Sequence, residues 1–321
     1  MPILISDFKT SLLFRHKHFS TMYRTLFTNP KVNFSRNRIQ TVDKDFIDLD
    51  FSISNSKQLA VLIHGLEGSS NSKYILSTTQ YLNKQNIDVV VFNLRGCSGE
   101  LNHKLKAYHS GETSDLKFVL KHLRENFNYE KVALVGFSLG GNMVLKYLGE
   151  QEKNLPKELN AAISVSPPCD LKGSSYELAK KSNAIYMKRF LKTLTLKVFE
   201  KSKQFPNEKI DLKGIMNSKN FADFDNLFTA PSFGFKDAHD YWAKASSLFN
   251  LDKIQLPTYL LSAKNDPFLS DSCLPHDIAT NQPFLFLETP KHGGHIGFIQ
   301  SFNNAKNNWM EKKIANFIQK K

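Results

Sequence analysis

Cysteine is scarce in this chain, with three among 321 residues. Cys97, Cys169 and Cys273 lie far apart, so they predict neither a disulfide framework nor a zinc site. Such cysteine usage is typical of a reducing compartment, and we expect a cytoplasmic protein. The residues predict no metal and no cofactor.

Long hydrophobic runs are also missing. No apolar stretch approaches the roughly 20 residues that cross a bilayer. Charged residues at Asp7, Lys9, Arg15 and Lys17 interrupt the first segment, which therefore does not resemble a secretory signal. Hydrophobic residues still make up 41% of the chain, enough for a large core. This composition suits one α/β domain with an insertion, or two domains, and we favour a single domain over residues 1–321.

Acidic residues are outnumbered, 30 Asp and Glu against 43 Lys and Arg, and the net charge is +13. A basic chain suggests a nucleic-acid partner, but the lysines are spread along the whole chain and no zinc-finger or basic-zipper pattern occurs. A lysine-rich solvated surface is favoured, with no nucleic acid bound. A weak peripheral association with anionic membrane, at the inner face, stays open.

Apolar runs that indicate strands alternate with helical patterns along most of the chain. The alternation predicts a mostly parallel, doubly wound sheet with right-handed crossovers; the runs fall at 58–63, 87–94, 132–135, 161–165, 258–263 and 283–287. Residues 45–52 alternate between polar and apolar, which predicts an edge strand with one face in water. Residues 1–40 are basic and aromatic, and we expect an N-terminal arm packed on the domain rather than a membrane-contacting one.

The alternation breaks between about residues 171 and 253. This stretch has many aromatic residues but no buried strand run, and residues 186–198 place their apolar side chains on one helical face. We interpret it as a helical cap inserted over the carboxyl ends of the strands. The alternative is a set of ordinary helices with no part in binding.

A short buried strand runs into Gly136-x-Ser138-x-Gly140, and a helix follows. A strand–turn–helix with this G-x-S-x-G pattern presents a serine hydroxyl above the sheet edge, and the tight turn requires small neighbours. The backbone N–H of Leu139, next in the chain, then points at the same position. An inert serine in a glycine-rich turn is the alternative.

His64-Gly65-Leu66 ends an earlier strand, where a second backbone donor for an oxyanion is placed in folds with this elbow. We therefore expect the Leu66 and Leu139 amides to form an oxyanion hole. A simple glycine turn would explain His64-Gly65 as well.

A serine needs a base and a group that orients the base. Asp266 follows a later strand, and His295 lies after the last one, so the chain order is Ser, Asp, His. His295 is favoured over His292 because two glycines directly before it let the loop bend toward the sheet edge. A turn-capping role for Asp266 and a His-x-x-His metal site are the alternatives, although the latter lacks a third ligand.

With these residues in place, the sequence resembles the YheT-like branch of the α/β-hydrolase superfamily (abhydrolase family 4). The resemblance covers nearly the whole chain. It is carried by the segments 17–21, 64–68, 93–96, 108–111, 136–142, 224–225, 229–231, 233–235, 237–238, 265–268 and 293–298. Lys17, Arg24 and Asn226 depart from the family pattern, where glycine, proline and aspartate are usual.

The resemblance implies an α/β-hydrolase fold and serine carboxylesterase activity through Ser138, Asp266 and His295, on small-molecule or lipid esters. Some members of the branch act as acyltransferases to alcohols, so acyl transfer is the alternative activity, and a non-catalytic binding module is the alternative from another class. We expect Phe137 and Phe190 to contact substrate. The apolar face of the cap predicts a preference for medium-chain acyl groups.

Overall fold

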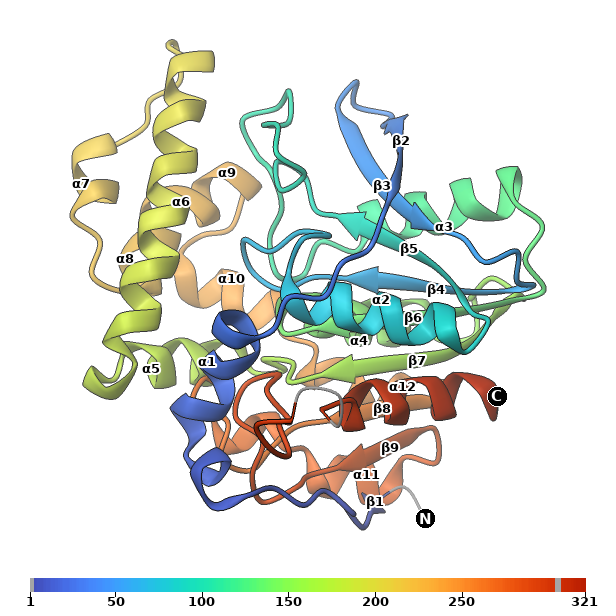
Figure 1. Ribbon diagram of the computed structural model, residues 1–321. Coiled ribbons are helices and arrows are strands. Elements are labelled where there is room, and N and C mark those ends of the chain that lie inside the picture. Colours follow the sequence, from blue (N-terminus) through green and yellow to red (C-terminus); the bar gives the residue numbers. More distant parts are fainter. Residues whose placement is uncertain (1–2, 304–306) are drawn as a thin grey trace.

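The computed structural model describes residues 3–303 and 307–321, and its centre is a nine-stranded sheet (Figure 1). The strands follow the order β1-β9-β8-β7-β6-β4-β5-β3-β2. Their bounds are β1 Ile3–Leu4, β2 Ser35–Gln40, β3 Phe46–Ser52, β4 Gln58–Ile63, β5 Asp88–Asn93, β6 Lys131–Phe137, β7 Leu159–Val165, β8 Thr258–Leu261 and β9 Leu285–Glu288.

The strands from β1 to β5 in this order pair in parallel, whereas β3 pairs antiparallel with both of its neighbours, β5 and β2. β4 and β6 lie side by side at the centre, with Ile63 opposite Gly136. Both are almost entirely buried, as strands covered by helices on both faces must be. The predicted doubly wound, mostly parallel sheet is confirmed.

The prediction of an edge strand at residues 45–52 is wrong. β3 is flanked by β5 on one side and by β2 on the other, and six of its seven residues are buried. The alternating Asp48 and Asp50 that suggested a wet face are instead paired with Arg38 and Arg36 of β2, at 2.7 Å in both cases. Alternation therefore marked an ion-paired face and not a solvated one.

Helices cover both faces of the sheet (Figure 1). One apolar core joins the sheet to α2 (Lys73–Lys84) and α12 (Trp309–Gln319), and a second joins its other face to α3 (Ser114–Asn126) and α4 (Leu139–Gln151). A short α11 (His276–Asn281) precedes β9. Among the described residues, no helix is long and apolar enough to cross a membrane.

The segment between β7 and β8 is helical, as expected for about 171–253. Figure 1 shows it beside the carboxyl ends of the strands, with α6 as its longest element. Its helices are α5 Leu171–Ala179, α6 Ala184–Gln204, α7 Leu212–Met216, α8 Phe221–Phe224, α9 Ala230–Phe233 and α10 Ala238–Ala245, and a π-helical turn, η3, spans Asp225–Thr229. A separate apolar cluster holds α6 against Phe268, which follows β8.

The first 40 residues serve both edges of the sheet. β1 pairs with β9 at one edge, whereas β2 forms the other. Between them, α1 (Lys17–Phe27) packs beside the loop after β9. Arg24, where the related family has proline, is buried and bonds Glu311 of α12 at 2.5 Å and the Gly297 carbonyl at 3.1 Å. The departure thus ties α1 to the C-terminal helix.

Candidate active site

Ser138 stands in the turn between β6 and α4 with φ of 52° and ψ of −120°. A non-glycine residue adopts such a conformation only where the surroundings impose it. The surroundings here are tight: a Cβ on Gly136 would overlap the backbone of Gly140, and a Cβ on Gly140 would overlap the carbonyl of Ile63 in β4. The glycine spacing therefore follows from the close approach of α4 to the central strands.

Three polar side chains from three separate loops meet at this turn. The His295 Nε2 lies 2.9 Å from the Ser138 Oγ, and the His295 Nδ1 lies 2.8 and 3.1 Å from the two Asp266 oxygens. Asp266 Oδ1 also accepts the backbone N–H of Phe268 at 2.9 Å, which fixes the carboxylate. The structure thus brings together the serine, histidine and aspartate predicted from the sequence.

His292 is not part of this arrangement. Its Nδ1 is buried without a hydrogen-bond partner in the described part of the chain, and it contacts neither Ser138 nor Asp266. Over residues 3–303 and 307–321, no group of three His, Cys, Asp or Glu side chains is arranged to hold a metal ion.

The N-terminal helix α1 holds the histidine loop. The Thr21 hydroxyl accepts the backbone N–H of His295 at 2.9 Å, and the Ser20 hydroxyl donates to the Gly293 carbonyl at 2.8 Å. Gly294 has φ of 61°, and a Cβ there would lie 2.6 Å from the Thr21 Oγ1. Sequence reasoning missed these two positioning residues; the only signal was the likeness of residues 17–21 to a family segment.

Leu66 and Leu139, whose amides were expected to form the oxyanion hole, line the same cavity as Ser138 and His295. Neither N–H forms a hydrogen bond within the described residues, so both remain able to donate. Behind them, His64 is fully buried: its Nε2 accepts the N–H of Leu94 at 3.1 Å, and burial lowers its pKa to about 4. His64 is therefore a neutral brace for the loop that carries Leu66.

Glu67, directly after Leu66, is bound from two sides. Tyr108 accepts the backbone N–H of Glu67 at 2.9 Å and donates to its carboxylate at 2.7 Å, and Lys197 of α6 donates to the same oxygen at 2.7 Å. Burial acts to lower the pKa of Lys197, but Cys97 and Glu67 outweigh it and raise that pKa, so the amine stays charged. Glu67 itself has a positive φ of 53°. A buried ion pair thus connects the helical insertion to the loop of the Leu66 amide.

A largely apolar cavity opens over the serine and extends beneath α6. Its empty volume is about 1130 Å³ with the open mouth included. Phe190 lines this cavity. Phe137 does not: its ring is fully buried in the core on the α2 face, 5.0 Å from the Tyr74 ring. Successive side chains point to opposite sides along an extended backbone. Phe137, the last residue of β6, therefore points away from the cavity that Ser138 faces.

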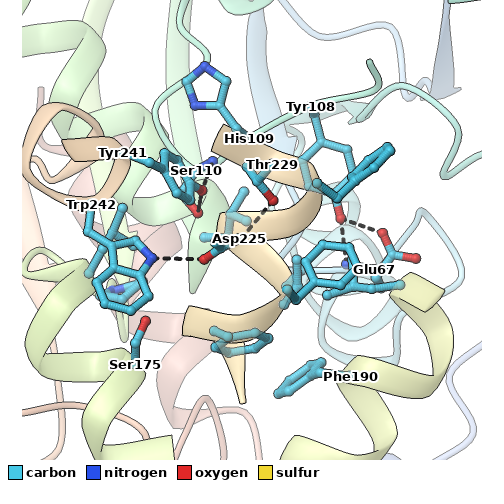
Figure 2. A pocket seen from close by; sticks show the side chains of 18 of the residues that line it. Glu67, Tyr108, His109, Ser110, Ser175, Phe190, Asp225, Thr229, Tyr241 and Trp242 are labelled. Atoms are coloured by element: carbon cyan, nitrogen blue, oxygen red, sulfur yellow. Dashed lines mark hydrogen bonds between the residues drawn. The ribbon is translucent and has the colours of Figure 1, made fainter. Parts of the chain in front are cut away.

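Polar side chains interrupt the apolar wall at the far side from Glu67, as Figure 2 shows. Asp225 accepts a hydrogen bond from the Thr229 hydroxyl at 2.7 Å and another from the Trp242 Nε1 at 2.8 Å. Burial raises the pKa of Asp225 to about 6, against the opposing effect of these two bonds. Nearby, Tyr241 bonds Ser110 at 2.9 Å. Apart from its place in a family motif, Asp225 carries no local signal that would single it out from the sequence.

Comparison with known proteins agrees with this fold. Residues 60–302 match the family described as "alpha/beta hydrolase fold". The chain is 34% identical to the esterase-named protein YheT of Escherichia coli K12, over 95% of this chain and 91% of that one. It is 29% identical to "Phospholipase ABHD3" of Mus musculus, over 93% and 75%. Among solved structures, the esterase Pf2001 of Pyrococcus furiosus superimposes with a TM-score of 0.60 at 18% identity, over 91% of this chain and 97% of that one.

The fold and these similarities define a carboxylic ester hydrolase of α/β-hydrolase fold. Within that superfamily, the chain belongs to the YheT-like branch, because its identity to YheT extends over nearly its full length.

Proposed function

We propose that this protein is a serine carboxylesterase in which Ser138 is the nucleophile, His295 the general base and Asp266 the group that orients the base. The observation that carries the proposal is the continuous hydrogen-bond chain from the Asp266 carboxylate through both nitrogens of His295 to the Ser138 hydroxyl. A serine hydroxyl reacts readily with an ester only when its proton is removed during attack, and His295 in this series of hydrogen bonds can remove it.

The residues support the following order of events. His295 accepts the Ser138 proton at Nε2 as Oγ attacks the ester carbonyl, and Asp266 stabilises the resulting imidazolium through Nδ1. The free Leu66 and Leu139 amides receive the charge that develops on the carbonyl oxygen. His295 then returns the proton to the leaving alcohol, and water, activated by the same histidine, releases the acyl group from Ser138.

The apolar cavity supports a substrate with a hydrophobic acyl chain. Phe190, Leu194 and Val198 of α6 line it together with Phe268, and a site of this kind gains about 0.8 kcal/mol for each methylene group that it buries. We propose medium-chain or lipid esters as substrates, in keeping with the phospholipase name of one relative. Acyl transfer to an alcohol would use the same acyl-enzyme.

Exposed residues of α6 support a weak attraction to anionic lipid surfaces. Ile185 and Leu196 are 73% and 56% exposed, and Lys188 and Lys192 of the same helix are exposed as well. Apolar contacts and basic side chains together favour a negatively charged bilayer. Sedimentation with anionic vesicles should decrease as salt rises, because counterions screen the attraction; binding that ignores salt and lipid charge would contradict this proposal.

The decisive test of the proposed function is Ser138→Ala. Hydrolysis of p-nitrophenyl esters should fall by roughly four to six orders of magnitude, with an unchanged fold by circular dichroism. A fluorophosphonate probe should add one adduct to the wild type, located on Ser138 by mass spectrometry, and none to the variant. An adduct on another serine, or a variant that keeps its activity, would overturn the assignment. Added ethanol separates hydrolysis from acyl transfer by the product formed.

A further inference from the structure

The cavity contains a buried carboxylate that the proposed reaction does not use. Asp225 lines the cavity from η3, and only 8% of the residue is exposed. In the described part of the chain it pairs with no cation, since its partners are the neutral donors Thr229 and Trp242. π-Helical turns of this kind are rare and often occur at functional sites.

Each Asp225 oxygen retains capacity to accept. A carboxylate oxygen takes about two hydrogen bonds, and each Asp225 oxygen receives one from the protein. An apolar group that filled this part of the cavity would strip water from the carboxylate and replace none of its bonds. A ligand hydroxyl would replace them, and sites that are built to bond a hydroxyl discriminate strongly against analogues that lack it.

A second polar group lines the same cavity as the carboxylate. Ser175 of α5 lines the same cavity, and Figure 2 shows its hydroxyl directed toward Trp242 and Asp225. This hydroxyl has no hydrogen-bond partner among residues 3–303 and 307–321. Asp225 accepts only, whereas Ser175 can donate, so the two together match a group that both donates and accepts.

The surroundings favour a neutral hydroxyl over a cation. Lys197 and Lys201 also line the cavity, and they would repel a positively charged ligand. Trp242 donates its ring N–H to Asp225, so the edge of the indole faces the carboxylate. A cation would be attracted to the face of the ring instead.

We propose that Asp225 and Ser175 form a hydroxyl-binding subsite, so that the enzyme prefers esters that carry a free hydroxyl group, such as polyol esters or esters of hydroxy acids. The expected preference in kcat/KM rests on the proposed esterase function, but binding of a hydroxyl group to the subsite does not require hydrolysis. Asp225 accepts the hydroxyl proton in a hydrogen bond, and Ser175 donates to the hydroxyl oxygen.

The test compares matched substrates. Glyceryl decanoate is set against propyl decanoate, and a p-nitrophenyl ester of 10-hydroxydecanoic acid against that of decanoic acid, so that the hydroxyl lies on the alcohol or on the acyl side. In at least one pair, kcat/KM should favour the hydroxyl-bearing ester by about 10-fold or more. An ester ended by an amine, matched in length, should gain nothing.

The variants separate recognition from folding. Asp225→Asn keeps the shape, because its carbonyl can accept from Trp242 while its amide donates to Thr229, and it should reduce the preference by about 10-fold without slowing the plain esters comparably. Ser175→Ala should reduce the preference severalfold and leaves Asp225 and its partners in place. The control is Asp223→Asn, the same change two residues earlier on a side chain outside the cavity wall, which should leave the preference unchanged.

Binding gives an answer independent of turnover. Calorimetry with 1-O-decyl glycerol and with decyl propyl ether, neither of which is an ester, should show tighter binding of the glycerol ether to the wild type and loss of that difference in Asp225→Asn and Ser175→Ala. Equal binding of both ethers, or equal loss for hydroxylated and plain esters in the variants, would overturn the subsite. Failure of every ester to react while the ethers are still distinguished would instead overturn the esterase proposal and leave the subsite standing.

Discussion

Replacement of Lys197 by methionine should harm both stability and turnover, through the loop that follows Leu66. Lys197 Nζ donates to the Glu67 carboxylate at 2.7 Å, and the two side chains are 16% and 6% exposed. Methionine keeps the length of the side chain but leaves the carboxylate with Tyr108 as its single side-chain partner. The change therefore uncouples α6 from the loop and also strands a buried charge.

The magnitude follows from the burial of this pair. Removal of one partner of a fully buried ion pair costs about 3–5 kcal/mol, and the partial exposure of Lys197 places the expected loss at about 2–4 kcal/mol. With unfolding entropies typical of a chain this long, the Tm should fall by about 3–6 °C. Loss of an oxyanion donor costs about 100- to 1000-fold in kcat, so a displaced Leu66 amide should cost about 10-fold, with little change in KM.

The assay is thermal unfolding together with steady-state hydrolysis of p-nitrophenyl esters at a temperature where every variant is folded. Lys192→Met, an exposed lysine of the same helix, is the matched control and should behave as the wild type. Glu67→Gln combined with Lys197→Met removes the stranded charge and should recover part of the Tm but not the kcat. If Lys197→Met lowers the Tm while kcat stays unchanged, the ion pair serves stability alone and the positioning argument is refuted.

Two further predictions concern the catalytic loop and the cavity. His295→Ala should reduce hydrolysis as severely as the loss of Ser138, whereas His292→Ala should keep most of the activity, because only His295 bonds the serine and the aspartate. The measurement is kcat/KM of both variants, and the reverse result would reassign the base. Across p-nitrophenyl esters of rising acyl length, kcat/KM should increase a few-fold per carbon up to medium chains. Phe190→Ala should shift that optimum, since Phe190 lines the cavity. An acetate optimum that the variant does not move would mean that α6 packs against the fold and does not contact substrate.

The sequence alone was sufficient for the parallel strands β4 to β9 and for the three residues that meet at the elbow, but not for β1 and β2, which lie in the segment expected to be an arm. Buried parallel strands are continuous apolar runs, and the glycines at 136 and 140 record a close approach that no other residue tolerates, so both leave local signals. The glycine pair before His295 is a signal of the same kind, and it separated this histidine from His292.

Only the tertiary structure decided what depends on contacts between distant segments. Alternation at residues 46–52 could not reveal that β2 supplies arginines to Asp48 and Asp50. Because β2 pairs with β3, β3 lies inside the sheet and not at its edge. Phe137 was expected at the substrate because it precedes the serine, but the pleat of β6 turns it into the opposite core.

The same holds for the residues that surround the chemistry. Thr21 lies 274 positions from the His295 amide that it holds, and Lys197 lies 130 positions from Glu67. A hydroxyl, an amine or a carboxylate such as Asp225 has no local pattern that states its partner, because side-chain hydrogen bonds impose no spacing along the chain. The sequence by itself therefore determined the backbone geometry of the site. Only the tertiary structure determined which distant side chains position the site and line its cavity.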